Sequence, residues 1–260
     1  MSRDISLVER WVLGGGTILA FLLLWETVVR IDAVDSKILP PASVVLGRYM
    51  SELASPAFYV DLRATLFRVA GGLGLAIVIA VPLGLLIGYW SLLSRMFGLT
   101  IEVLRPIPAI ALLPVVSVIF GLGAGTNIAL IFIATSIPIL TATIDGVRSV
   151  DPVLIGTART LGRSTRDIFL TVLLPASLPH LSAGLRLSMT IALLVGISVE
   201  MLVSAEGLGI RVVMASRLLD MSGLYAGVLL LSTLGFLVNQ AYLQVEHFLL
   251  FWHRQSRSRR

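Results

Sequence analysis

Six long apolar stretches constrain what this chain can fold into. A helix that crosses a bilayer needs roughly 20 consecutive, mostly apolar residues, and each stretch comes close to that length. The stretches cover residues 11–29, 66–90, 99–120, 128–144, 183–203 and 224–249. The composition agrees, because 57% of the 260 residues are apolar and only 13% are charged, whereas an ordinary soluble domain has about 25% charged residues. The sequence predicts an all-α polytopic membrane protein with six transmembrane helices.

Missing residue types exclude several kinds of chemistry. The chain has no cysteine, which excludes disulfides, cysteine-ligated zinc and a thiol nucleophile. A phosphate-binding loop needs the pattern Gly-x-x-x-x-Gly-Lys-Ser/Thr, and the only lysine, Lys37, follows Asp35 and Ser36. We therefore expect no ATP hydrolysis by this chain and no metal or cofactor bound to it. The net charge of +5 is too thinly spread for a nucleic-acid interface.

The basic residues indicate the orientation of the chain. With the N-terminus placed inside, the inner segments hold 11 of the 20 basic residues and the outer segments hold 6. The positive-inside rule then places both termini in the cytoplasm. We divide the chain into a cytoplasmic N-terminus (1–10), a transmembrane domain (11–250) whose long cytoplasmic loop covers 145–182, and a basic cytoplasmic tail (251–260).

Prolines make the third apolar stretch irregular. It contains Arg105, followed by Pro106, Pro108 and Pro114. Proline removes a backbone donor, and within a bilayer such breaks persist only where protein or a water-filled cavity satisfies the freed carbonyl groups. The stretch is therefore either part of a transport pathway or a kinked packing helix.

Ionisable residues inside the apolar stretches are usually functional. Glu200 is a further pathway candidate, deep in the fifth stretch. We favour a structural or gating role for it, paired with a buried arginine, because an ionised carboxylate would repel an anion. Arg105 is the better candidate for binding an anion. We nevertheless favour a structural role, in which it donates hydrogen bonds to the carbonyl groups freed by the prolines. Glu246 is better explained as a helix-end residue.

Glycines in the second stretch predict close helix packing. Gly84 and Gly88 lie four residues apart and are preceded by Gly71, Gly72 and Gly74. Small residues at this spacing let two helices approach closely.

The loop between the first two stretches predicts a short amphipathic helix on the outer surface. Its apolar residues at helical spacing are Leu46, Tyr49, Met50 and Leu53. Arg48 and Glu52 lie four residues apart on the opposite face, where they can form an ion pair.

The cytoplasmic loop begins with a strong helix start. Asp151 can cap a helix whose first residue is Pro152. Leu154, Ala158 and Leu161 then recur at helical spacing and form one apolar stripe. This stripe must be buried, either against the protein's own helix ends or against a partner.

A second helix follows after a glycine. Gly162 is placed to end the first helix in a left-handed conformation. Ser164 and Asp167 have the spacing of a capping box, which opens the apolar run 168–174. We expect Pro175 and the proline after it to close this run.

At this loop the chain resembles the membrane subunit, or permease, of bacterial ATP-binding-cassette (ABC) importers of the type I architecture. The hallmark of that family is Glu-Ala-Ala, three residues, Gly, nine residues, Ile, one residue and Leu-Pro. The same spacing is kept here by Gly156-Thr157-Ala158, Gly162, Val172 and Leu174-Pro175. Further segments similar to one branch of the family are 105–114, 120–123, 158–162, 174–179, 184–186, 200–201 and 207–209.

The resemblance covers about residues 38–240 and implies an assembly. Two copies of this chain would form the pathway in the bacterial inner membrane. Two ATPase subunits, which would hold ATP and Mg²⁺, would dock on the cytoplasmic side, and a separate substrate-binding protein would deliver the solute outside. That branch serves taurine, alkanesulfonates, nitrate, bicarbonate and some thiamine precursors, so we expect a small anion or a small heterocycle as the solute.

The resemblance also gives the loop a role. The helix 152–161 would be the coupling helix, seated in a cleft of the ATPase with its apolar stripe buried there. The residues expected to couple the two subunits are Asp151, Pro152, Gly156, Thr157, Ala158, Arg159, Thr160, Leu161, Gly162, Arg163, Leu174 and Pro175. Gly156 stands where the family has glutamate, which puts one polar contact with the ATPase in doubt.

Two functions from other classes are weaker alternatives. A stand-alone secondary transporter or channel is compatible with six spans, but it leaves the capped helix pair unexplained and no inverted repeat is visible. An intramembrane serine protease would use Ser198 and His247. Ser198 lies about 22 Å from the inner end of its span, whereas His247 lies near the inner end of the next. A nucleophile and its base must lie within about 3 Å of each other.

Overall fold

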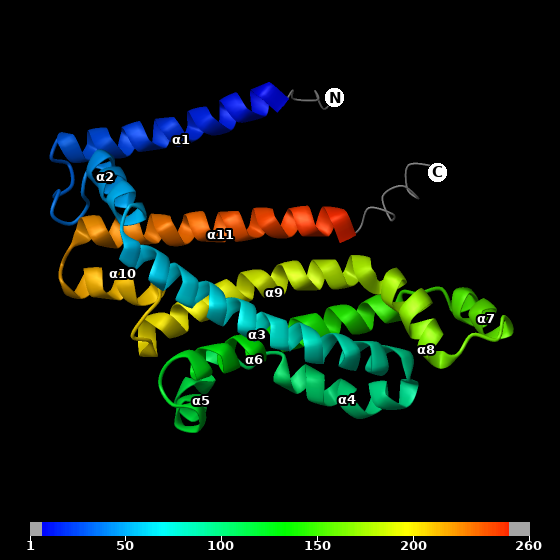
Figure 1. Cartoon of the computed structure of the whole chain (residues 1–260). Coiled ribbons are helices and arrows are strands. Elements are labelled where there is room, and N and C mark those ends of the chain that lie inside the picture. Colours follow the sequence, from blue (N-terminus) through cyan, green and yellow to red (C-terminus); the bar gives the residue numbers. More distant parts are fainter. Residues whose placement is uncertain (1–6, 250–260) are drawn as a thin grey trace. The chain divides into compact units, whose positions relative to one another are not determined.

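The computed structural model describes residues 7–249, and the side chains of residues 15–247; the described chain is helical and contains no strand (Figure 1). The α-helices are α1 (Leu7–Arg30), α2 (Ala42–Leu53), α3 (Pro56–Tyr89), α4 (Ser91–Leu104), α5 (Leu113–Phe120), α6 (Ala124–Arg148), α7 (Pro152–Thr160), α8 (Thr165–Ile168), α9 (Leu174–Val203), α10 (Leu208–Arg217) and α11 (Met221–Leu249). A 3₁₀ turn, η1 (Ala109–Leu112), precedes α5, and a π-helical segment, η2 (Phe169–Leu173), joins α8 to α9.

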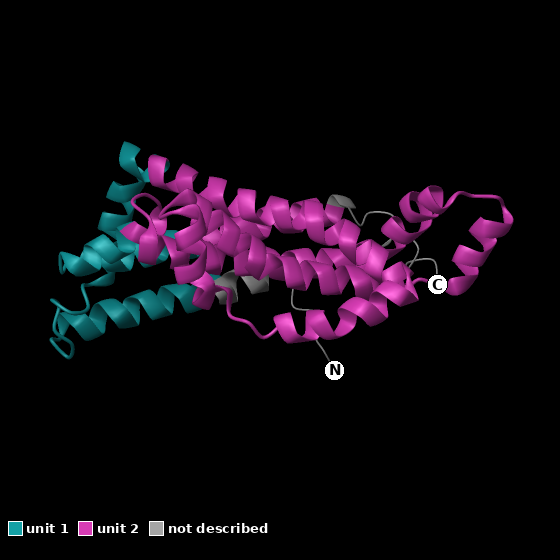
Figure 2. Cartoon of the chain, turned by 90° about the horizontal axis from the view of Figure 1, so that it is seen from below, with its two compact units in different colours: residues 1–59, 211–232 teal, residues 60–210, 233–260 magenta. Residues whose placement is uncertain are grey.

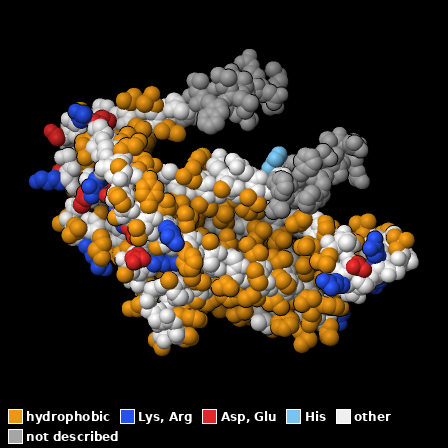
Figure 3. Space-filling view, viewed as in Figure 1, with side chains coloured by type: hydrophobic (Ala, Val, Ile, Leu, Met, Phe, Trp, Pro, Cys, Tyr) orange, Lys and Arg blue, Asp and Glu red, His pale blue; other side chains and the backbone are white. Residues whose placement is uncertain are grey.

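The chain forms two compact units (Figure 2). The first, residues 1–59 and 211–232, contains α1, α2, most of α10 and the beginning of α11. The second, residues 60–210 and 233–260, contains most of α3 and all of α4 to α9. Figure 3 shows hydrophobic side chains over the visible face of the second unit, with charged side chains gathered around α7. This distribution is the one expected of a unit that lies in lipid and exposes α7 to water.

Four described helical runs are long and apolar enough to cross a membrane: α3, α6, the run Thr165–Val203, and α11. The pair of α4 with η1 and α5 would make a fifth span, although it bends by 85° at its break. The predicted first span, 11–29, falls within α1, and part of it lies outside the residues whose side chains are described. A multi-pass helical architecture is therefore confirmed, whereas the count of six spans stays a prediction.

The core of the second unit depends on a stripe of small residues along α3. Gly72, Ala76, Ala80, Gly84 and Gly88 recur every four residues and so share one helix face. Ala76 and Ala80 are buried. A methyl group at Gly84 would lie 2.6 Å from Cβ of Thr143 on α6, and one at Gly88 would lie 2.7 Å from Cβ of Val147. The predicted close packing is confirmed, and α6 is the partner helix.

A second, neighbouring face of α6 packs against α9 in the same manner. A Cβ atom at Gly184 of α9 would lie 2.3 Å from Cβ of Ala142, and one at Gly146 of α6 would lie 2.9 Å from Cβ of Ser177. Helix α6 is thus held between α3 and α9, and 11 of its 25 residues are buried.

The third predicted span is two helices. Helix α4 ends at Leu104, and α5 begins at Leu113 after the η1 turn. Pro106 and Pro108 supply no backbone donor, and each disfavours helical backbone at the residue before it. We refer to residues 105–108 as the break.

The fifth predicted span begins earlier than 183. The prolines do not close the run 168–174, because α9 starts at Leu174 with Pro175 in its first turn and continues through Pro179. Proline in a first turn removes a donor that has no helical partner. The wider π turn of η2 lets α8 run directly into α9. The second helix of the loop is therefore the beginning of a long span.

The predicted outer helix forms as α2, but with a different inner face. Arg48 and Glu52 lie 3.2 Å apart as expected. Leu46 and Met50 are exposed, whereas Val45 is fully buried. Glu52 also pairs with Arg211 of α10. The pair of Glu52 with Arg211 therefore helps to hold α2 within the first unit. Tyr49 and Leu53 are half-buried, so the apolar face predicted from the sequence is right for these two residues and wrong for Leu46 and Met50.

The small-residue contact makes a direct prediction. Gly72→Ala should lower the stability of the purified protein by about 1–3 kcal/mol, because the added methyl would lie 2.5 Å from Cβ of Ile131 and 2.8 Å from the carbonyl oxygen of Ile128. Gly74→Ala, on the same helix, adds a methyl with no atom within 4 Å. Thermal unfolding in detergent should show a lower melting temperature for the first variant only; equal melting temperatures would contradict the α3–α6 contact.

Candidate functional site

Helix α7 is fixed at both ends by its own sequence. The carboxylate of Asp151 accepts a hydrogen bond of 2.8 Å from the backbone N–H of Val153, and Pro152 occupies the first turn. At the other end Gly162 has φ +72°, a left-handed conformation that glycine adopts without strain. The predicted start, end and terminating glycine of this helix are confirmed.

The next turn contains the predicted capping box. Ser164 accepts a hydrogen bond from the backbone N–H of Asp167, and the Asp167 carboxylate accepts one from the backbone N–H of Ser164. These paired bonds satisfy two donors that a helix start otherwise leaves free. The connection between α7 and the long α8–α9 run is therefore a defined turn.

The apolar residues of α7 divide between two faces. Ala158 is buried in a cluster with Val147, Val150, Ile168 and Leu173, and Ile155 packs against the same cluster. Three other apolar side chains point away from the chain: Val153, Leu154 and Leu161 are 69%, 53% and 74% exposed. The predicted single stripe of Leu154, Ala158 and Leu161 is wrong in this detail, since only Ala158 is turned inward. We call Val153, Leu154 and Leu161 the outward face of α7.

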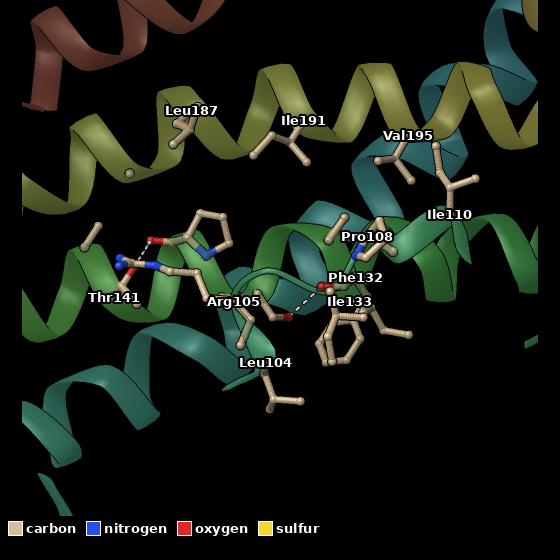
Figure 4. A pocket seen from close by; sticks show the side chains of 18 of the residues that line it. Leu104, Arg105, Pro108, Ile110, Phe132, Ile133, Thr141, Leu187, Ile191 and Val195 are labelled. Atoms are coloured by element: carbon tan, nitrogen blue, oxygen red, sulfur yellow. Dashed lines mark hydrogen bonds between the residues drawn. The ribbon is translucent and has the colours of Figure 1, made fainter. Parts of the chain in front are cut away.

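A cavity of about 930 Å³ lies among the break, α6 and α9 (Figure 4). Its lining is mainly apolar and includes Pro108, Phe132, Leu187 and Ile191. The break forms part of one wall, because its unwound backbone turns the chain toward α6. A cavity of this size can hold a small molecule.

Arg105 places a positive charge in this apolar lining. Its side chain extends from the break toward the end of the cavity near Thr141 (Figure 4). Among the described residues it has neither an ion-pair nor a hydrogen-bond partner for its guanidinium, so it does not hold the carbonyl groups freed by the prolines. Asp145 and His180 also line the cavity. Of the other pathway candidates, Pro108 lines the cavity, whereas Pro106, Pro114 and Glu200 do not belong to the lining that the structure describes.

Glu200 is fully buried and bonded on both oxygens. One oxygen accepts a hydrogen bond of 2.9 Å from Arg68. The other accepts bonds of 2.9 Å from the Thr65 hydroxyl and 3.1 Å from the Gly209 N–H. The partner arginine that the sequence left open is therefore Arg68 of α3. Arg186 pairs instead with Glu246, at 2.5 Å.

This network fixes the turn between α9 and α10. Arg68 also donates to the carbonyl oxygen of Glu206, and the Asp61 carboxylate accepts a bond from the N–H of Gly207. Gly207 has φ +120°, and a Cβ atom there would lie 2.4 Å from the carboxyl carbon of Glu200. Sequence patterns alone gave no sign that Asp61, Thr65 and Arg68 belong to one site. The sequence does place one arginine, Arg68, one helical turn before the small-residue stripe of α3.

Removing Arg68 should leave the buried Glu200 carboxylate without its ion-pair partner and so destabilise the protein. Arg68→Ala should lower stability by about 3–5 kcal/mol, measured as thermal or denaturant unfolding in detergent. Arg63→Ala, on an exposed site of the same helix, is the matched control and should change little. Glu200→Gln should cost less than Arg68→Ala, because the amide oxygen still accepts hydrogen bonds. If Arg68→Ala and Arg63→Ala unfold alike, the network does not stabilise the turn.

Comparison with protein families gives one match, to the family described as binding-protein-dependent transport system inner membrane component, over residues 80–249. This segment contains the break, the cavity, α7 and the turn after α9. The match therefore covers α7 and the cavity, whereas Asp61, Thr65 and Arg68 of the charged network lie before it.

Individual relatives are transport permeases. The chain is 29% identical to the taurine transport system permease protein TauC of Escherichia coli, over 92% of this chain and 88% of the relative. It is 33% identical to an ABC transporter permease protein of Methanocaldococcus jannaschii, over 88% and 83%. It is 28% identical to the formylaminopyrimidine transport permease protein ThiX of Halalkalibacterium halodurans, over 92% and 94%.

A solved structure shares the fold. Inward-facing crystal forms of the MetNI methionine ABC transporter contain a chain that superposes with a TM-score of 0.66 at 21% identity, covering 75% of this chain and 98% of that one. The relatives are permease subunits, which removes the serine protease and stand-alone transporter alternatives. This chain belongs to the binding-protein-dependent transport system inner membrane component family, and it is a membrane-embedded permease subunit of an ABC importer.

Proposed function

We propose that α7 is the helix through which this permease couples to its ATPase. The observation that supports this role is the outward face, where Val153, Leu154 and Leu161 are exposed to solvent although they are apolar. Exposed apolar side chains close together are typical of an interaction site. The inner face packs on α3, α6 and η2, so a force applied to the outward face acts directly on the membrane helices.

Two basic residues beside the outward face also support docking of the ATPase there. Arg163 and Arg166 are exposed, and among the described residues neither guanidinium has a hydrogen-bond or ion-pair partner. Gly156 is also exposed, and a side chain there would meet no atom of this chain within 4 Å. The ATPase surface opposite Gly156 would then supply the polar group that the glutamate supplies elsewhere in the family. The sequence also predicts Asp151, Pro152, Thr157, Ala158, Arg159, Thr160, Gly162, Leu174 and Pro175 at this contact. Of these, Ala158 is turned into the chain's own core and Arg159 bonds to Tyr89, so neither belongs to the proposed docking surface.

The assembly that fits this role contains two copies of this chain, two ATPase subunits that hold ATP and Mg²⁺, and an extracytoplasmic binding protein. The chain itself would bind no cofactor. With α7 facing the ATPase, both termini would lie in the cytoplasm, and residues 1–10 and 251–260 would flank a transmembrane domain of 11–250.

We further propose that the cavity lies on the solute pathway and that the solute is a small anion. The unpartnered guanidinium of Arg105 in an apolar lining is the observation that favours this, since it offers a charge-assisted hydrogen bond to a sulfonate or carboxylate. Relatives are named for taurine, aliphatic sulfonates and bicarbonate. ThiX is named for formylaminopyrimidine, which makes a small heterocycle the second candidate.

Gly162→Val tests the coupling role. A β-branched residue strains φ +72°, so the turn that aims α7 should distort. In proteoliposomes that contain the whole importer, we expect ATP hydrolysis to continue while solute uptake falls several-fold. Gly235→Val is the matched control, because a side chain there meets no atom within 4 Å and the backbone is helical. Unchanged uptake by Gly162→Val would contradict the role of α7.

Arg105→Gln tests the solute. The loss of a charge-assisted hydrogen bond, worth about 1.5–3 kcal/mol, should raise the KM for taurine uptake by about 10-fold or more. Arg95→Gln on α4 is the control, because Arg95 is exposed and does not line the cavity. A thermal-shift screen of the binding protein with taurine, bicarbonate and pyrimidines identifies the solute independently. Equal KM values for both variants would remove Arg105 from the pathway.

A further inference from the structure

An aromatic cluster lies at the corner between α3 and α4. The ring centroid of Tyr89, the last residue of α3, lies 5.4 Å from that of Trp90 and 4.9 Å from that of Phe169. The centroids of Trp90 and Phe169 are 5.7 Å apart. Trp90 immediately precedes α4, and Phe169 is the first residue of η2. The three rings therefore join this corner to the segment that follows α7.

Arg159 brings α7 itself into the cluster. Its guanidinium donates a hydrogen bond of 2.5 Å to the hydroxyl oxygen of Tyr89. The guanidinium carbon lies 5.8 Å from the centroid of the Tyr89 ring, within the range of a cation–π contact. Arg159 follows the buried Ala158 directly, so a single turn of α7 both packs on the core and bonds to the end of α3.

Helix α4 has few other attachments. None of its side chains is fully buried. Leu93 and Ile101 pack partly buried against the α3–α6–α9 core, and Ser94 accepts a hydrogen bond from Arg148 at the end of α6. With 14 residues, α4 is about 21 Å long. It begins at the aromatic corner and ends at the break, so a rotation of the corner displaces the wall of the cavity.

We propose that the hydrogen bond between Arg159 and Tyr89 transmits displacement of α7 through α4 to the break. The inference rests on the proposed coupling role of α7. Energetic coupling between distant sites can be carried by rigid secondary elements, and α4 is a continuous helix of 14 residues with no buried side chain. Neither Tyr89 nor Arg159 lines the cavity, so both are positioning residues.

The absence of cysteine from the chain permits a clean experiment. Ile107→Cys places a single thiol in the break, at a site that is 43% exposed and lines the cavity. The importer, assembled with its ATPase in lipid nanodiscs, is treated with a maleimide, either without nucleotide or trapped with ATP and vanadate. The labelling rate of this chain, resolved by gel from that of the ATPase, reports movement of the break without any knowledge of the solute.

Three variants are compared in that background. In the parent, trapping should change the labelling rate several-fold. Tyr89→Phe, which keeps the ring and loses only the hydroxyl, should reduce that change at least threefold while ATP hydrolysis persists. Tyr59→Phe is the same substitution at an exposed position of the same helix, and it should behave as the parent. Arg159→Gln combined with Tyr89→Phe also removes the cation–π contact, so it should reduce the change at least as far as Tyr89→Phe alone.

The outcomes separate the link from the coupling itself. If the parent responds and Tyr89→Phe responds fully, the link is overturned and the coupling role of α7 survives. A double variant that responds as fully as the parent also overturns the link, because both contacts between Arg159 and Tyr89 are then dispensable. If an assembled, ATP-hydrolysing parent gives no change on trapping, both the link and the proposed coupling are overturned.

Discussion

The close contact between α3 and α6 is the interaction on which the rest of the second unit depends. Two helices in lipid gain little from the hydrophobic effect, so they associate mainly through packing. The small residues of α3 at every fourth position bring its backbone against Thr143 and Val147 of α6. Helix α6 contacts both α3 and α9, and the ends of α3 and α6, together with η2, form the surface on which α7 packs.

The same contact positions the charged network. Arg68 lies one helical turn before Gly72, so it continues the small-residue stripe of α3. The stripe therefore holds a large charged side chain at its end, where α9 finishes and the chain turns. There Arg68 meets Glu200 at 2.9 Å. A buried ion pair is costly unless its remaining atoms are bonded, and the bonds from Thr65, Gly209 and Glu206 meet that requirement.

Local signals predicted the local structure well. Asp151, Gly162 and Ser164 each determine the conformation of their neighbours, so the beginning and end of α7 and the capping box could be read directly. Signals that depend on distant contacts were not readable. The division of Ile155 and Ala158 from Leu154 and Leu161 depends on where α6 and η2 lie, and the pairing of Glu200 with Arg68 joins residues 132 positions apart. The continuity of α9 through Pro175 depends on a π turn, which has no recognised sequence signature.

Substitutions on the two faces of α7 have different consequences. Substitutions at Ile155 or Ala158 alter a cluster built from this chain alone, so they lower the stability of its fold. Val153, Leu154 and Leu161 are more than half exposed, so substitutions there should change the fold much less. Under the proposed coupling role of α7, the identity of the docking partner can change through a few solvent-facing positions, without a compensating change in the membrane core.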